Sequence, residues 1–145
     1  MKTSFIFELS EFIKYAEDGG QKEAMEVEVI APSKKLYKKT YLLQQIVTQS
    51  LLKAQDIMPK GDGEAKEDTE ISGKDMKMIL LAGGADIEAC IDQVCKLGKE
   101  GCIKVGGNNI NFIQWDSIDP MDQEKLACEF IANFTFPLVM NSLTN

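Results

Sequence analysis

The sequence predicts an α+β fold: a mainly helical single domain with an N-terminal β-hairpin, a second short hairpin and about four helices. Three observations lead to this prediction. Apolar and polar residues alternate within the first thirty residues, which is typical of half-buried strands. From Lys34 onward the apolar spacing becomes helical in several segments. A chain of 145 residues with 44% hydrophobic residues suits one domain with its own core.

The N-terminal hairpin is predicted from two alternating segments. TSFIFEL (residues 3–9) reads as a strand, and FIKYA (12–16) is expected to continue it past a bulge or bend. EDGG (17–20) offers a turn, and MEVEVIA (25–31) is the clearest strand in the chain. A hairpin alone is only marginally stable, so its apolar face must lie on helices.

The first helix is predicted from Lys34 to about Gln55, because Pro32 ends the strand and Ser33 is a suitable N-cap. Its buried face is expected to contain Leu36, Tyr37, Tyr41, Leu43, Val47, Leu51 and Ala54, widened by Leu42, Ile46 and Leu52.

Lysines 34, 35, 38 and 39 fall in the first two turns of this helix, where positive charge opposes the helix dipole. They form either a docking patch for an acidic partner or a solvated surface that offsets nearby glutamates. Charge runs are usually solvated faces, and the sequence leaves both interpretations open.

Residues 57–71 are predicted to form a mobile acidic linker within the single domain 1–145, between an N-terminal hairpin–helix half and a C-terminal helical half. The segment is either ordered by a partner or a tolerated insertion between two packed halves.

The second half begins with two capped helices and a hairpin. Ser72 and Asp86 are the expected N-caps, and Gly83-Gly84 is expected to end the first of the two helices. CIKV (102–105) and INF (110–112) flank GGNN, whose residues tolerate the angles of a tight turn. GGNN is not followed by a lysine-serine or lysine-threonine pair, so a phosphate-binding loop is rejected.

The last helix is predicted to begin at Asp119, with Pro120 at its first position, and to end before Pro137. The residue before a proline avoids helical angles, which is why this stop is expected. The apolar surface of this helix and of the tail beyond it must be covered either by the domain or by a partner. The candidate partner-binding residues are Phe130, Phe134, Phe136, Leu138, Val139 and Met140.

The sequence contains no catalytic signature. It has no histidine, which removes the commonest general base and metal ligand. Asp116, Asp119 and Asp122 are the closest acidic cluster, yet capping and dipole charge explain their spacing better than calcium binding does. We therefore expect no enzyme activity, no metal and no cofactor, with a carboxylate-dependent enzyme as the remaining alternative.

Four cysteines, at positions 90, 95, 102 and 128, form no C-x-x-C pair. We expect most of them to be small, buried, reduced thiols rather than ligands of a structural zinc ion.

The formal charge of -7 argues against nucleic acid as the main partner. No apolar run approaches the roughly 20 residues of a membrane helix, and the N-terminus lacks the pattern of a signal peptide. A cytosolic protein is expected.

The layout of the chain resembles that of the tail assembly chaperones of long-tailed bacteriophages. The resemblance lies in FELSEFIKYAEDGGQKEAMEVEVIAPS (7–33), the long helix, the charged linker and the closing WDSIDPMDQEKLACEFIANFTFP (115–137). It covers most of the chain and concerns order, patterning and composition.

The resemblance implies a non-enzymatic protein that coats the tape measure protein and recruits tail tube subunits during tail assembly. It also implies a place in the host cytoplasm and absence from the mature virion. A homo-oligomer, a frameshifted longer form, and a structural role in the tail or the head–tail connector remain open alternatives.

Overall fold

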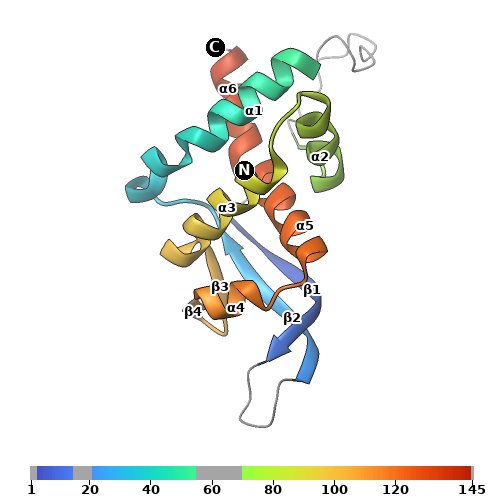
Figure 1. Ribbon diagram of the computed structural model, residues 1–145. Helices are drawn as coiled ribbons and strands as arrows, with labels where there is room; N and C mark the ends of the chain where they lie inside the picture. The colour runs from blue at the N-terminus through green and yellow to red at the C-terminus, as the bar shows by residue number, and fades with distance from the viewer. Residues whose placement is uncertain (1–2, 15–20, 55–69, 145) are drawn as a thin grey trace.

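The computed structural model describes residues 3–14, 21–54 and 70–144 (Figure 1). The predicted EDGG turn (17–20) and nearly all of the predicted linker (57–71) lie outside the described residues. The architecture is α+β and mainly helical, with a sheet at one end of the molecule and the helices stacked above one of its faces (Figure 1). This confirms the predicted fold class.

The first half contains β1 (Ser4–Lys14), β2 (Gln21–Ile30), a 3-10 helix η1 (Lys34–Thr40) and α1 (Tyr41–Ala54). The second half contains α2 (Gly73–Ala82), α3 (Ile87–Leu97), the short helical turn η2 (Gly98–Cys102), β3 (Ile103–Val105), β4 (Asn108–Asn109) and α4 (Phe112–Asp116). It ends with α5 (Pro120–Phe130), a π-helical turn η3 (Ile131–Thr135) and α6 (Phe136–Thr144).

The two predicted hairpins are joined into one antiparallel sheet of order β1-β2-β3-β4. The register of β1 against β2 shifts between Leu9 and Phe12, which is the bulge expected from the sequence. Val29 of β2 pairs with Ile103 of β3, and both side chains are fully buried against the helices. The sheet therefore connects the two halves of the chain.

The second hairpin is shorter than predicted. Gly106 and Gly107 make its turn with φ values of 58° and 84°, which glycine adopts without strain. β4 consists of Asn108 and Asn109, which were expected in the turn, and the expected INF strand (110–112) is wrong. Asn111 begins α4 instead: its side chain accepts a hydrogen bond from the amide of Gln114, whose own side chain accepts one from the amide of Asn111. This capping box favours helix over strand.

α2 and α3 begin where the sequence predicts. The side chain of Ser72 accepts a hydrogen bond from the amide of Asp75, and that of Asp86 accepts one from the amide of Ala89. α2 ends in a Schellman motif, because Gly84 has φ 73° and the amide of Ala85 bonds back to the carbonyl of Leu80.

Gly83 has a different role, which the sequence does not show. A Cβ atom at Gly83 would lie 2.4 Å from the Cα of Ser50 and 2.8 Å from its carbonyl oxygen. The glycine therefore allows the end of α2 to approach the backbone of α1 directly.

The predicted stop at Pro137 is wrong. Asp119 and Pro120 start the last helix as expected, and Asp119 Oδ1 accepts a bond of 2.8 Å from the amide of Met121. The helix then continues through η3, where the amide of Phe136 bonds to the carbonyl of Ile131, five residues back. This π turn changes the carbonyl register just before Pro137, whose ring would clash with a regular α-helical turn.

As a result, one helix in the described chain, Pro120–Leu143, is long and apolar enough to cross a membrane by length and composition alone. The sequence prediction found no such run because it divided the helix at Pro137. Of the most apolar 18-residue segment of this helix, 61% is buried inside the fold. Core helices of folded domains can be equally long and apolar.

Candidate functional site

The six predicted partner-binding residues lie mainly in the core. Phe130, Phe134, Phe136 and Val139 are 0%, 3%, 5% and 3% exposed. Leu138 and Met140 are half-buried. Phe136 and Val139, which were expected on an apolar surface past the helix stop, turn inward instead, because the helix continues through Pro137. The domain itself covers Phe130, Phe134, Phe136 and Val139, and it leaves Leu138 and Met140 partly exposed.

Aromatic packing shows how the last helix closes the core. The rings of Phe130 and Phe134 meet edge to face with centroids 5.2 Å apart. Phe134 also packs on Phe5 of β1 at 5.5 Å. Leu126 and Phe130 are fully buried, so this stripe belongs to the core.

Several large apolar residues are exposed in the fold, and four of them lie together on η1 and α1. We call this surface the α1 face and define it as Tyr37, Tyr41, Leu42, Gln45, Gln49 and Leu52. Its four apolar members are 42%, 53%, 45% and 54% exposed, in that order. Tyr37 and Tyr41 pack edge to face, with ring centroids 5.6 Å apart. The sequence had placed these four residues in the buried face, which is wrong.

The opposite side of α1 explains this orientation. Leu43, Val47 and Ala54 are fully buried, as predicted, and they recur at helical spacing. Ser50 lies among them, with its hydroxyl donating to the carbonyl of Ile46 at 2.8 Å. Since this side contacts α2 and the last helix, the α1 face points to solvent.

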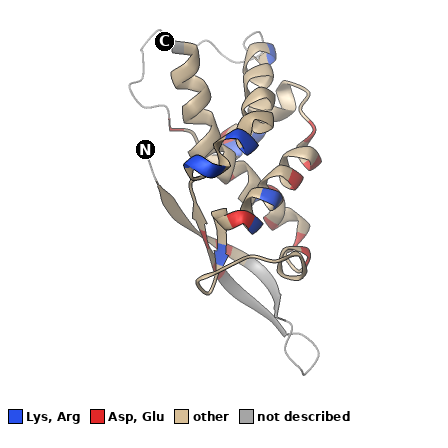
Figure 2. Cartoon of the chain, turned by 90° about the vertical axis from the view of Figure 1, so that its left-hand side faces the viewer, with Lys and Arg blue, Asp and Glu red and all other residues tan. Residues whose placement is uncertain are grey.

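The charge around the α1 face differs from that of the whole protein. Residues 34–54 contain five lysines and no acidic residue, whereas the chain has 23 acidic and 16 basic residues. Lysines 34, 35, 38 and 39 are all exposed on η1. Blue segments of this run face the viewer in the middle of Figure 2. The α1 face is therefore an uncharged, partly aromatic surface with a basic border.

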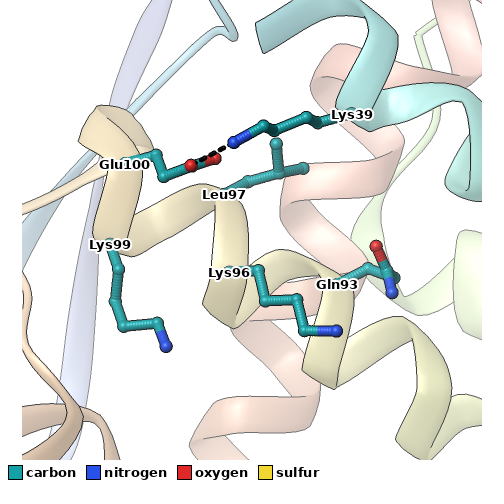
Figure 3. A pocket seen from close by; sticks show the side chains of 6 residues that line it. All are labelled: Lys39, Gln93, Lys96, Leu97, Lys99 and Glu100. Atoms are coloured by element: carbon teal, nitrogen blue, oxygen red, sulfur yellow. Dashed lines mark hydrogen bonds and ion pairs between the residues drawn. The ribbon is translucent and has the colours of Figure 1, made fainter.

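A cavity of about 440 Å³ lies beside this border, between η1 and the end of α3 (Figure 3). We call it the lysine cleft; its lining residues are Lys39, Gln93, Lys96, Leu97, Lys99 and Glu100. Lys39 forms an ion pair with Glu100, as the dashed line in Figure 3 shows. The ammonium of Lys99 lies 3.0 Å from the centroid of the Phe112 ring.

The lysine cleft brings together residues that the sequence analysis did not connect. The run at 34–39 drew attention to Lys39, but nothing in the local pattern placed it beside residues 93–100. Only the packing of η1 against α3 creates the cleft.

A second cavity of about 340 Å³ lies between α2, α5 and β1. Three of the charged side chains that line it, Lys77, Glu124 and Glu129, have partners. Lys77 Nζ lies 2.9 Å from Glu124 Oε1, and this hydrogen bond raises the pKa of Lys77. Glu129 accepts a hydrogen bond of 3.0 Å from the amide of Gly73 and so caps α2 from the neighbouring helix. Both carboxylates are used structurally.

The three aspartates considered for the enzyme alternative lie in different environments. Asp119 caps α5, Asp116 is exposed, and Asp122 is buried. Within residues 3–14, 21–54 and 70–144, no group of three or more His, Cys, Asp or Glu side chains could hold a metal ion.

All four cysteines are free and buried, as predicted for most of them, and burial is the main cause that raises the pKa of each. The pKa reaches about 11 for Cys90, Cys102 and Cys128.

We expect iodoacetamide at pH 8 to leave the folded protein unmodified over minutes and to alkylate four thiols after unfolding, as read by mass spectrometry. Rapid alkylation of the folded chain would show that the thiols are accessible.

The same shifts set a pH dependence of stability. Unfolded thiols ionise near 9.0, whereas Cys90, Cys102 and Cys128 ionise near 11 in the folded chain. Between these values the unfolded state binds fewer protons than the folded state. Their contribution to stability is therefore complete below pH 9 and is lost as the pH rises towards 11. Urea unfolding at pH 8 and 10.5 measures this loss. The free energy of unfolding should decrease less between the two pH values for Cys102→Ala than for the original chain.

Comparison with protein-family models, with curated proteins and with solved structures finds no match to this chain.

Proposed function

We propose that this chain is a non-enzymatic assembly chaperone of the phage tail type, which binds a long helical client through the α1 face. The supporting observation is the exposure of Tyr37, Tyr41, Leu42 and Leu52 on one outer surface that the core does not cover. Exposed apolar groups of this kind mark interaction sites when they lie together.

The chemistry of the α1 face suits such a client. Tyrosine offers a large apolar ring with a polar hydroxyl, and it is enriched in protein interfaces. Gln45 and Gln49 lie between the apolar members, so the surface contains no charge that an apolar client would have to desolvate. The surrounding lysines keep the border polar.

The biological role in the proposal comes from the family resemblance. The client is then the tape measure protein, and the tail tube protein is the second partner. The chaperone acts in the host cytoplasm, needs no cofactor and leaves before the virion is complete. A homo-oligomer is compatible with this role.

Co-purification with a tape measure fragment tests the proposal. The variant Tyr41→Gln/Leu52→Gln removes apolar surface from the α1 face without adding charge. We expect it to weaken client binding at least about tenfold, because exposed aromatic residues often dominate interface energies. The matched control is Ile113→Gln/Met121→Gln, which changes two slightly more exposed apolar residues on α4 and α5 and should bind like the original chain.

Two results would overturn the proposal: no binding of the fragment by the original chain, or equal binding by the α1 variant and the original chain. Mass spectrometry of purified particles separates a chaperone from a structural tail or connector component, since only the structural component would be retained in them.

A further inference from the structure

We infer that the lysine cleft binds a carboxylate-rich segment of the client, and that Glu100 occupies the place of a client carboxylate until the client arrives. This inference rests on the proposed function, because it names the chemistry of the segment that lies next to the α1 face.

The lining of the cleft favours an anionic group. Lys39, Lys96 and Lys99 contribute to the lining, together with one carboxylate, Glu100. In Figure 3 the ammonium of Lys39 points to Glu100, whereas those of Lys96 and Lys99 point away from this pair, and that of Lys99 lies over the Phe112 ring. A volume of about 440 Å³ has room for more than one carboxylate side chain. Lys39 comes from η1 and the others from α3 and η2, so the packing of distant segments builds the site (Figure 3).

The ion pair between Lys39 and Glu100 is suited to exchange. Its side chains are 57% and 39% exposed. Exposed pairs contribute little to stability, so replacing Glu100 by an external carboxylate costs the fold little. An acidic ligand would form an ion pair with the ammonium group of Lys39, while the side chain of Glu100 turns to solvent.

The position of the cleft favours a peptide over a nucleic acid. Lys39 is in the same basic run that borders Tyr37 and Tyr41, so one segment with acidic and apolar residues could cover both surfaces. A nucleic acid needs a series of phosphate contacts, and the chain outside residues 34–54 is even more acidic than its total charge of -7 indicates.

Fluorescence anisotropy with a labelled peptide of glutamate residues tests the inference, with the matching glutamine peptide as the uncharged probe. We expect binding of the glutamate peptide alone, weakened by added salt. Lys39→Gln/Lys96→Gln should reduce affinity about five- to tenfold, and Glu100→Gln should raise it about threefold, because it removes the competing carboxylate. The control, Lys74→Gln/Lys125→Gln, makes the same charge change at exposed lysines on α2 and α5 and should leave the affinity unchanged.

The inference requires that the lysine variant lowers the affinity for the glutamate peptide and that Glu100→Gln raises it. A merely structural ion pair would give no gain in affinity for Glu100→Gln, and this outcome overturns the inference. Equal loss in the cleft variant and its lysine control also overturns it, as does tighter binding of an oligouridine RNA than of the glutamate peptide. All substitutions are at surface positions, where the effect on folding is small, and circular dichroism checks it.

The two proposals can fail separately. If the tape measure fragment binds and depends on Tyr41 and Leu52 but is indifferent to Lys39 and Lys96, the proposed function stands and the inference fails. If the fragment does not bind while the glutamate peptide shows the expected opposite effects, the cleft is an acidic-peptide site and the assigned client is wrong.

Discussion

Replacement of Phe136 by serine is expected to lower the free energy of unfolding by about 3–5 kcal/mol. The phenyl ring is 5% exposed, so its removal leaves a cavity in the core and places a hydroxyl there. Urea unfolding followed by the fluorescence of the buried Trp115 would measure the change. A loss of this size is a large fraction of the stability of a small domain.

Leu143→Ser is the matched control for Phe136→Ser. Leu143 is in the same helix, α6, but is 50% exposed, so we expect a change within about 0.5 kcal/mol. If Phe136→Ser left stability intact and weakened only client binding, Phe136 would belong to a binding surface rather than to the core.

Gly83→Ala is expected to cost about 3 kcal/mol, at the upper end of the range for overpacked sites. The new Cβ atom would meet the backbone of Ser50, at 2.4 Å from its Cα, and a backbone cannot rotate away as a side chain can. α1 and α2 would have to separate, and they would then lose packing between Ser50, Val47 and their neighbours. Thermal and urea unfolding would both report the loss.

Gly84→Asn separates this steric effect from backbone conformation. Gly84 has φ 73° and open space where its Cβ would be, and asparagine tolerates this region of backbone angles. We expect a cost below about 1 kcal/mol. A larger cost at Gly84 than at Gly83 would contradict the close approach of the two helices.

The N-caps and the alternating strands were predictable because they depend on neighbouring residues. Ser72, Asp86 and Asp119 each accept a bond from an amide two or three residues ahead, so the signal is local. In β2, Val27 and Val29 are buried and Glu26 and Glu28 are exposed, as the alternation predicts.

The exposed side of α1 could not be predicted in the same way. The sequence analysis treated residues 34–55 as one α-helix, but η1 is a 3-10 helix through Thr40. A 3-10 helix turns about 20° more per residue than an α-helix, so the expected face rotates by more than a quarter turn before α1 begins. Tyr37 was therefore assigned to the wrong side. Tyr41 begins α1 and lies about 200° around the helix from the buried Leu43, so its exposure follows from α-helical spacing, which the predicted face did not respect.

The remaining errors have non-local causes. Pro137 stays within a helix because the π turn at 131–135 and the burial of Phe136 and Val139 outweigh its local preference. The lysine cleft depends on η1 meeting α3, and the pairing of Val29 with Ile103 depends on tertiary packing. No window of adjacent residues contains these contacts.

The sheet order also has a consequence for synthesis of the chain on the ribosome. β2 pairs with β3, and α1, α2 and α3 are translated between them. At about 5–20 residues per second, roughly 4–15 s pass between translation of Val29 and translation of its partner Ile103. During this interval the edge of β2 that β3 later covers is open to other strands, including those of neighbouring nascent chains.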